Sequence, residues 1–320
     1  MPTKKKTAPR SVKRGYRLRN WREYTASLVS RGSLTFWLDE EALSGWMNQV
    51  KTGKKGASLL YTDSAILCAL TLQQVYHLPL RATEGLLGSV LALLGADLPV
   101  PDYSTLSRRR KNLPVYLQSP HSGQALHLVI DSTGFKVYGE GEWKVRQHGY
   151  SKRRTWRKLH LAIDADTQQI VVATLTTNAC ADAEVVPDLL DGVDAAIATV
   201  AADGAYDTRA CYEAIRKKAA RAVIPPRKGA RIWVHGNCRQ ERLDRDQNLR
   251  AIRKVGRKRW KEQSGYHRRS LAETGMFRLK TLFSDRLSAR EFDGQATELF
   301  VRCRALNKMS ALAMPQSYAA

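Results

Sequence analysis

The sequence predicts an α/β protein whose N-terminal third is helical. Residues 63–113 carry apolar side chains at helical spacing, interrupted by prolines. After Pro120 the pattern changes to short apolar runs of strand length, which alternate with two helical segments. Residues 266–280 return to helical periodicity. These three observations together predict a sheet-containing core that is preceded by helices and closed by a helix.

The charge balance indicates a polyanionic partner. The chain has 53 Lys+Arg against 30 Asp+Glu, a net charge of +23, which points most simply to nucleic acid. Structural binding of the ribosomal type is the alternative. We see no run of eighteen apolar residues and no hydrophobic leader, so we expect neither a membrane span nor a signal peptide, and a cytoplasmic chain.

A basic arm is expected at the N-terminus. Residues 1–22 carry nine Lys or Arg and no acid, with interruptions at Pro2, Pro9 and Gly15. This composition is typical of a disordered arm, which we assign to residues 1–19. Ordering on DNA phosphates is the favoured role, and a contribution to solubility alone is the alternative.

Three helices are predicted before residue 120. Asp63 can N-cap a helix that runs to Tyr76, and Pro79 suits the first turn of a second helix over residues 80–94. A third, short helix follows over residues 103–113, after the prolines at 99 and 101.

The third helix is the candidate for entering a DNA groove. It carries Arg108, Arg109 and Arg110, which we expect to bind DNA in a module like a helix-turn-helix. The spacing is not diagnostic, and a plain helical bundle with one basic exposed helix fits equally well.

Two strands are predicted to deliver carboxylates. Residues 125–131 form an apolar run that ends in Asp131, and residues 196–202 form another that ends before Asp203; Ser-Thr-Gly and Gly follow them, respectively. Strands are also expected at 155–164, 169–177 and 221–226. We assign Asp164 and Asp166 to a turn and Asp207 to the N-cap of the next helix.

Residues 227–261 form a strongly basic segment. They hold thirteen Lys or Arg against Glu241, Asp244 and Asp246, with little apolar periodicity. We interpret the segment as a long insertion that lies on phosphate and not as core. A solvated loop is the alternative.

The segment from Tyr266 to Lys280 has an unusual charge pattern. At about 100° per residue, one face carries an aromatic hydroxyl, two cations and one acid. Leucines and an alanine occupy the other side, as a docked helix requires. The charged face comprises Tyr266, Arg269, Glu273 and Lys280, and the apolar stripe comprises Leu271, Ala272, Leu279 and Leu282. A surface helix with incidental charge pairs would look similar.

Adjacent strand ends and a helix packed over them could bring Asp131, Asp203 and Glu273 together. Three carboxylates would repel one another unless divalent cations lay between them, and hard oxygen ligands suit Mg²⁺ or Mn²⁺. Two such ions can stabilise the attacking and leaving oxygens of a displacement at phosphorus. The residues alone therefore support a metal-dependent enzyme that acts on DNA or RNA.

Three motifs carry a resemblance to a known family. They are DSTG at Asp131, ADGAYD at Asp203, and the signature tyrosine, two residues, arginine, three residues, glutamate, six residues, lysine, which is complete here at Tyr266, Arg269, Glu273 and Lys280. HGYSKRRTWRKLHLAID, LTTNACADAEVVPDLL and VRCRALNKM extend the similarity over roughly residues 20–310. The chain resembles the DDE transposases of bacterial insertion sequences, specifically the insertion-sequence-five group.

The resemblance implies a ribonuclease-H-like catalytic core over residues 121–310, in which Asp131, Asp203 and Glu273 bind the metal ions. It implies cleavage at terminal inverted repeats and attack of the 3′-hydroxyl ends on target DNA. Arg269 and Lys280 would hold phosphates and Tyr266 would contact the flanking DNA.

Further expectations concern the remaining regions. Residues 20–120 would bind the ends or mediate dimerisation, and residues 311–320 would form a tail. We expect at least a homodimer near the nucleoid, because two DNA ends must be held together. Additional DNA contacts are expected from Lys152, Arg153 and Arg154.

Two other functions remain open at this point. A metal-dependent nuclease of ribonuclease-H type would hydrolyse DNA without joining it. A non-enzymatic basic DNA-binding protein would use none of the acids.

Overall fold

The structure is a computed structural model, and it describes residues 15–38, 40–49, 59–117, 123–137, 156–235 and 243–319. The helices before residue 120 are α1 (Trp21–Ser30), α2 (Leu34–Trp37), α3 (Glu40–Ser44), α4 (Asp63–Val75), α5 (Leu80–Leu93) and α6 (Tyr103–Arg109), followed by the 3-10 turn η1 (Arg110–Asn112). The later helices and 3-10 turns are η2 (Asp182–Val185), α8 (Val186–Asp191), η3 (Gly204–Tyr206), α9 (Arg209–Lys217), α10 (Asp244–Val255), α11 (Arg257–Gln263), η4 (Tyr266–Arg269), α12 (Ser270–Phe283) and α13 (Phe292–Leu312).

A mixed six-stranded sheet forms the centre of the molecule. Its strands are β2 (Leu126–Val137), β3 (Trp156–Asp164), β4 (Ile170–Thr177), β5 (Ile197–Ala201), β6 (Arg221–Val223) and β7 (Arg286–Leu287). The order is β4-β3-β2-β5-β6, and β7 pairs with the far end of β2. Strand β3 runs antiparallel to both β2 and β4, whereas β5 runs parallel to β2 and β6.

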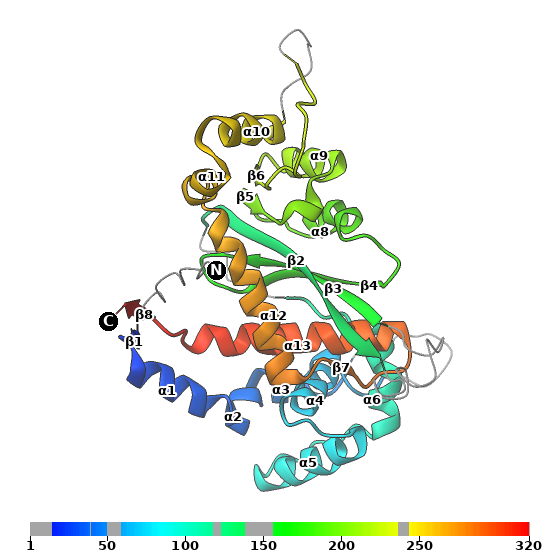
Figure 1. The fold of residues 1–320 in the computed structure, drawn as a ribbon. Helices are drawn as coiled ribbons and strands as arrows, with labels where there is room; N and C mark the ends of the chain where they lie inside the picture. The colour runs from blue at the N-terminus through cyan, green and yellow to red at the C-terminus, as the bar shows by residue number, and fades with distance from the viewer. Residues whose placement is uncertain are drawn as a thin grey trace, which may run out of the picture.

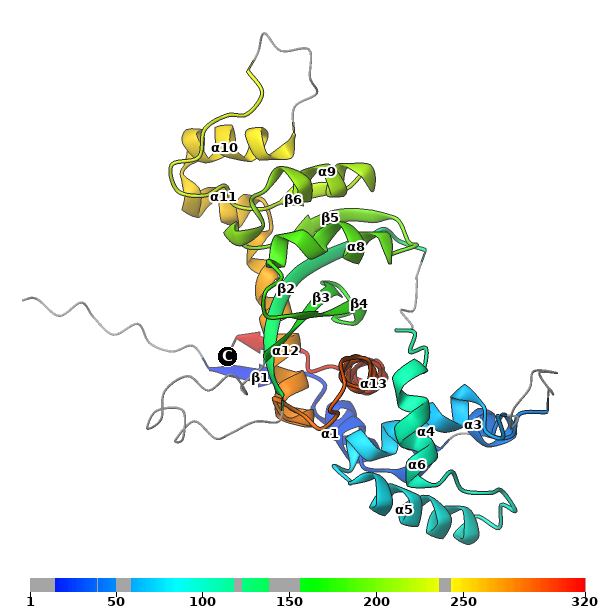
Figure 2. The same cartoon turned by 90° about the vertical axis from the view of Figure 1, so that its right-hand side faces the viewer.

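Helices cover both faces of the sheet (Figures 1 and 2). Alternate residues of β2 point to opposite faces. Leu128 and Ile130 pack in a cluster with α8 and α9, and Val129 and Phe135 pack in a larger cluster with α12 and α13. The side chain of residue 131 follows the parity of Val129 and therefore lies on the α12 face.

Strand β2 is longer than predicted. The sequence was expected to leave the strand at Asp131, but β2 continues to Val137 because β3 supplies ladder partners as far as Lys136 and Trp156. Gly134 is suited to this stretch, since a Cβ there would lie 3.2 Å from the ring of Trp156. Asp131 therefore lies in the middle of a strand and not at its end.

The predicted helix starts need two corrections. Thr62, not Asp63, caps α4 by accepting from the backbone N–H of Ala65, and Asp63 is the first helical residue. Thr208, not Asp207, caps α9 through the N–H of Cys211. A β-branched hydroxyl one residue away replaced the expected carboxylate in both cases. The predicted turn at Asp164 is confirmed, since its carboxylate accepts from the N–H and hydroxyl of Thr167.

Part of the basic segment 227–261 is packed into the core. The interpretation of the whole segment as an insertion outside the core is therefore wrong. Helices α10 and α11 fall in it, with Arg245 4 % exposed, Asp246 0 %, Leu249 6 % and Trp260 3 % exposed. The charge count failed here because Arg245 and Asp246 are buried together with other polar partners. Residues 236–242 of this segment lie outside the described ranges.

The N-terminal helices share one core with the sheet. A single cluster of buried side chains runs from Trp37 to Met309 and crosses residue 120. In its interior, Arg302 of α13 donates to Gln74 of α4 at 2.7 Å and pairs with Glu298 at 2.5 Å. Helix α13 thus lies between the sheet and α4 (Figure 2), and the division at residue 120 remains a prediction about function.

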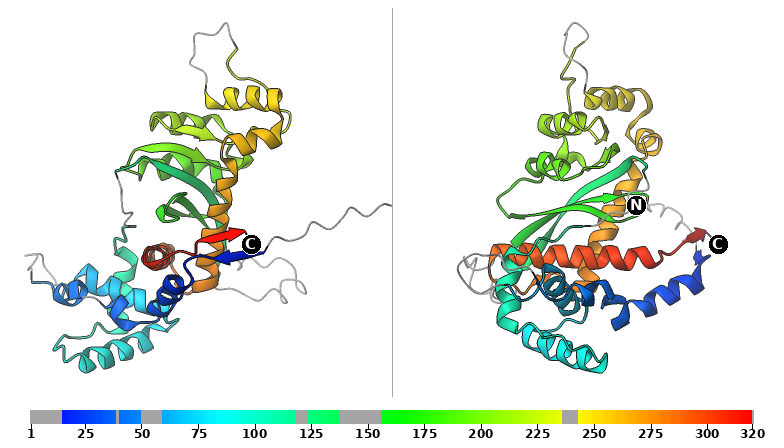
Figure 3. Two further views of the ribbon diagram at one scale, coloured as in Figure 1. Left: turned by 90° about the vertical axis from the view of Figure 1, so that its left-hand side faces the viewer. Right: turned by 180° about the vertical axis from the view of Figure 1, so that it is seen from behind.

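The two ends of the described chain meet. Strand β1 (Tyr16–Leu18) pairs antiparallel with β8 (Ser317–Ala319) as a separate two-stranded sheet (Figure 3). Asn20 reinforces the pairing through Met314 and Gln316. Among the described helices, none is both long and apolar enough to cross a membrane.

Candidate active site

The sheet register places Asp131 and Asp203 beside each other. Val129 of β2 pairs with Ala201 of the parallel strand β5. Each aspartate follows its paired residue by two positions, so Asp131 within β2 lies level with Asp203, which comes just after the end of β5. Asp203 follows the C-terminal end of β5 and precedes η3. Its Oδ1 accepts the N–H of Ala205 at 2.8 Å.

Helix α12 carries Glu273 across the face on which Asp131 lies. The helix is seated by Ala272, Met276 and Leu279, which are 0–6 % exposed. Gly275 permits a close approach to β3, since a Cβ there would lie 2.6 Å from Cδ1 of Ile163. Glu273 stands on the helix surface with its side chain 56 % exposed, as a side chain that meets a ligand requires.

The segment Tyr266–Lys280 is not one continuous helix as predicted. Tyr266–Arg269 form the 3-10 turn η4, which Gly265 starts with a left-handed φ of 74°. Helix α12 begins only at Ser270. The register between Arg269 and Glu273 survives because the turn is followed directly by the helix, and the two side chains form an i,i+4 ion pair.

Arg269 connects two of the three acids. Its Nη1 lies 3.3 Å from Oδ2 of Asp131, and its Nη2 bonds Oε1 of Glu273. Asp131 and Arg269 are both largely shielded, with side chains 19 % and 21 % exposed. The guanidinium therefore supplies a positive charge between the strand and the helix.

Burial first, and neighbouring charges second, shift the pKa values of the site. Burial raises the pKa of Asp131, the N–H of Ser132 and the charge of Arg269 lower it, and the nearby charges of Asp203 and Glu273 raise it further. Burial also raises the pKa of Tyr266, Arg269 lowers it, and Asp203 and Asp131 raise it. Asp131 therefore lies within electrostatic reach of Arg269, Asp203 and Glu273, and Tyr266 within reach of Arg269, Asp203 and Asp131.

The donor chemistry fits a hard divalent cation. All three acids offer oxygen, the ligand that Mg²⁺ and Mn²⁺ prefer. A guanidinium already bridges two of them, which shows that the site takes up positive charge. Within the described residues, however, no three His, Cys, Asp or Glu side chains are gathered closely enough to hold a metal ion. Binding would require Arg269 to release its carboxylates.

Among the described contacts, Lys280 approaches an aromatic ring and pairs with none of the three acids. Its Nζ stands 5.4 Å from the ring centroid of Phe135, four residues beyond Asp131 on β2. Burial lowers its pKa, Asp285 raises it and Lys136 lowers it. A phosphate contact by Lys280 remains a prediction.

Two of the three arginines in α6 and η1 are bonded or shielded within the chain. Arg109 pairs with Asp63 at 2.6 Å and donates to the carbonyl of Tyr61, and burial lowers the pKa of Arg110. Arg108 is exposed and contacts only its neighbour Thr105 in the described structure. DNA binding by these residues remains a prediction, and Lys152, Arg153 and Arg154 lie outside the described residues.

Sequence reasoning missed Tyr206. It follows Asp203 by three residues and is 2 % exposed. Burial raises its pKa, as do the charges of Asp131, Asp182 and Asp203. Its position within the ADGAYD motif, three residues after Asp203, is the sequence signal for it.

Acids on two neighbouring parallel strands, with a third on a helix across one face of a mixed sheet, define a mixed α/β protein consistent with a ribonuclease-H-like core. Two family models, both described as a transposase DDE domain, match residues 29–140 and 122–308. The second match spans more than half of the chain, and the protein belongs to the family of DDE-domain transposases. No solved structure matches the chain.

Proposed function

We propose that the chain is the transposase of a bacterial insertion sequence of the insertion-sequence-five family. It binds the terminal inverted repeats, cleaves DNA at the element ends and joins the 3′-hydroxyl ends to target DNA. The observations that support the proposal are the register that puts Asp131 and Asp203 beside each other on the sheet and the bonds of Arg269 to both Asp131 and Glu273. The net charge of +23 supports a DNA substrate.

Asp131, Asp203 and Glu273 would hold Mg²⁺, with Mn²⁺ as a substitute, because their ligand atoms are all carboxylate oxygens. When bound, two such ions would stabilise both the attacking and the leaving oxygen at phosphorus and would make a water or a 3′-hydroxyl more acidic.

The chain's own cations would position the DNA. Arg269 pairs with both Asp131 and Glu273 in the protein alone, and a DNA phosphate would compete for its guanidinium. Tyr266 lies beside it and would stack on, or hydrogen-bond to, the flanking DNA. Lys280 would hold a phosphate farther along the strand.

The remaining regions would hold the ends in place. We assign end recognition to residues 20–120 and non-specific phosphate contacts to residues 1–19. Coupled joining needs two ends held together, so the working unit would be at least a dimer, acting in the cytoplasm at the nucleoid.

A strand-transfer assay tests the proposal. Purified protein would be given a pre-cleaved end, a plasmid target and Mg²⁺. Joined product supports a transposase. Cleavage without joining would indicate a hydrolytic nuclease, and end binding without cleavage would indicate a DNA-binding protein only.

A further inference from the structure

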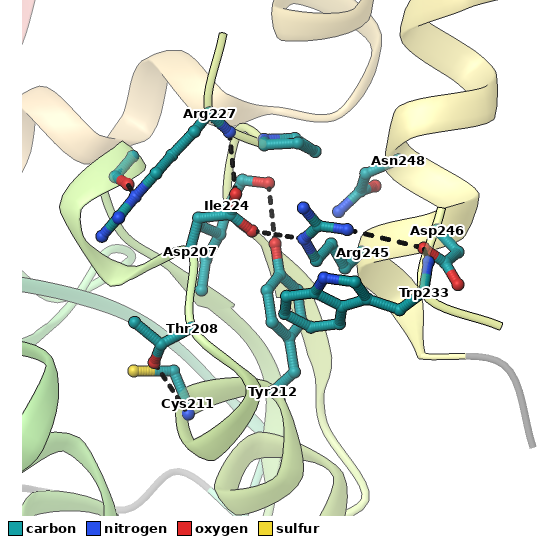
Figure 4. Close-up of polar contacts among 12 residues, drawn as sticks. Asp207, Thr208, Cys211, Tyr212, Ile224, Arg227, Trp233, Arg245, Asp246 and Asn248 are labelled. Atoms are coloured by element: carbon teal, nitrogen blue, oxygen red, sulfur yellow. Dashed lines mark hydrogen bonds and ion pairs between the residues drawn. The ribbon is translucent and has the colours of Figure 1, made fainter. Parts of the chain in front are cut away.

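A buried polar cluster adjoins the turn that carries Asp203 (Figure 4). At its centre, Oδ1 of Asp207 accepts from Nε of Arg245 at 2.7 Å, and the two side chains are 2 % and 5 % exposed. The guanidinium of Arg245 also donates to the carbonyl of Arg231 at 2.8 Å and lies 3.7 Å from the centroid of the Trp233 ring. Such a pair is costly to break, because one partner alone would be a buried unpaired charge.

Asp246 completes the attachment of α10. It is fully buried and accepts the N–H groups of Trp233 and Val234 at 2.9 and 2.8 Å. Asp244 and Asn248 bind the backbone of Ala222 in β6. Helix α10 is therefore fixed to the edge strand β6, the neighbour of β5, which leads into Asp203.

Arg227 links this cluster to the Asp203 turn. Its backbone N–H donates to Oδ2 of Asp207 at 2.8 Å. Its side chain turns back, with Nε 3.3 Å from the carbonyl of Gly204 and Nη2 3.1 Å from that of Ala205. Asp207 thus holds the backbone of Arg227, and the guanidinium of Arg227 holds the turn.

One peptide plane transmits this contact to Asp203. The carbonyl of Gly204 and the N–H of Ala205 belong to the same planar unit. Arg227 binds its oxygen, and Oδ1 of Asp203 accepts its N–H. Fixing the oxygen fixes the direction of the N–H, and so orients one oxygen of the carboxylate.

We propose that Arg227, held by the buried Asp207–Arg245 pair, is a positioning residue for Asp203. This inference rests on the proposed function, because it assigns Asp203 to the metal-binding acids. It also gives Arg227 a role within the protein, although the sequence predicts that the cations of residues 227–261 bind DNA phosphate.

The matched comparison is Arg227→Ala against Lys228→Ala. Both positions are exposed and adjacent, and both changes remove one positive charge. Only Arg227 bonds the turn among the described contacts. Lys228→Ala therefore measures the effect of charge alone, and Arg227→Lys tests whether the forked geometry of the guanidinium is needed.

Three measurements test the proposal. In metal-free protein, we expect the Ala205 amide to exchange with deuterium about tenfold faster in Arg227→Ala than in Lys228→Ala. Calorimetry should show Mn²⁺ affinity weakened several-fold in Arg227→Ala relative to Lys228→Ala. The kcat for cleavage should fall about tenfold or more, with KM for DNA no higher than in Lys228→Ala, and Arg227→Lys should recover part of the loss.

Equal behaviour of Arg227→Ala and Lys228→Ala in an active protein would overturn the proposal. So would faster exchange at Ala205 with unchanged Mn²⁺ affinity and kcat, since the contact would then be structural only. A parent chain that neither binds Mn²⁺ nor cleaves end DNA would instead refute the proposed function.

Discussion

Nη1 of Arg269 lies 3.3 Å from Oδ2 of Asp131, and the same guanidinium bonds Glu273. Arg269, one of the four residues of the tyrosine–arginine–glutamate–lysine signature, thus links two acids of the site when no DNA or metal ion is bound. Its positive charge offsets the repulsion between carboxylates that would otherwise oppose the packing of α12 near β2.

Removing this arginine should change how Mn²⁺ stabilises the protein. We expect Arg269→Ala to lower the unfolding temperature without Mn²⁺, because the carboxylates lose their counter-charge. The increase in unfolding temperature on adding Mn²⁺ should be larger in Arg269→Ala than in the parent, since the ion no longer competes with a guanidinium. A difference of about 1 kcal/mol corresponds to a shift of roughly 2–4 °C. Arg268→Ala, which removes an exposed arginine paired with Asp166, is the control. An equal increase in unfolding temperature with Mn²⁺ in both variants would contradict competition between Arg269 and the ion.

Each of the three acids should be required for cleavage. Asp131→Asn, Asp203→Asn and Glu273→Gln keep side-chain size and remove one anionic ligand, so folding and end binding should survive. Cleavage with Mg²⁺ should fall by at least about 100-fold, and double changes should cost little more. Asp166→Asn, at an exposed turn, is the control. Near-parental cleavage by a well-folded Glu273→Gln would remove α12 from the site.

The arginines of α6 should separate into two classes. Arg109→Ala breaks a half-shielded ion pair and a backbone contact, and should lower the free energy of unfolding by about 1–3 kcal/mol. Arg108→Ala should leave stability unchanged and weaken binding to the specific end more than to random duplex. Equal losses on both DNAs would mean that Arg108 contacts only phosphate.

Buried His160 should make the fold sensitive to acid. It is 1 % exposed, and burial lowers its pKa below the ordinary 6.5, with Asp182 opposing this and Lys158 adding to it. The unfolded chain then binds the proton more readily, so stability is fully present above about pH 6.5 and falls as the pH drops toward the lowered value. The change is roughly 1.4 kcal/mol per unit of pKa shift.

The check is the loss in unfolding temperature between about pH 7.5 and about pH 5.5. His160→Gln keeps a polar group for Thr176, which His160 contacts at 2.8 Å, and cannot titrate. It should lose less stability over this range than the parent. An equal loss would assign the acid sensitivity to other groups.

The corner between α10 and α11 should contribute to salt-dependent DNA binding. Arg253, Lys254 and Lys258 are exposed there. Changing all three to Gln should reduce the slope of log affinity against log salt by about 0.9 for each lost phosphate contact. Lys217→Gln, at the end of α9, is the control. An unchanged slope would place this corner away from DNA.

The strands around Asp131 and Asp203 were predictable because buried strands leave continuous apolar runs. The extent of β2 was not, because its second half is held by β3 and not by its own apolar pattern. The acids of the site could be named from spacing and resemblance, whereas the bond between Arg269 and Asp131 depends on the tertiary approach of α12.

Asp207 shows why local reasoning stopped short. It stands two residues before the first residue of α9, close to the position where an acid often caps a helix. Its partner Arg245 lies 38 residues away, and no local pattern distinguishes that arginine from the exposed ones around it. The same limit applies to β1 and β8, whose pairing joins opposite ends of the described chain.

The shared core around α13 has a mechanical consequence. Arg302 ties α13 to α4, and the N-terminal helices α4–α6 share one cluster of buried side chains with β2, α12 and α13. If these helices bind the element end, a fixed length of duplex would separate the bound sequence from the scissile phosphate at the active site. Cleavage would then occur at a constant number of base pairs from the bound sequence, even when that sequence is moved along the DNA.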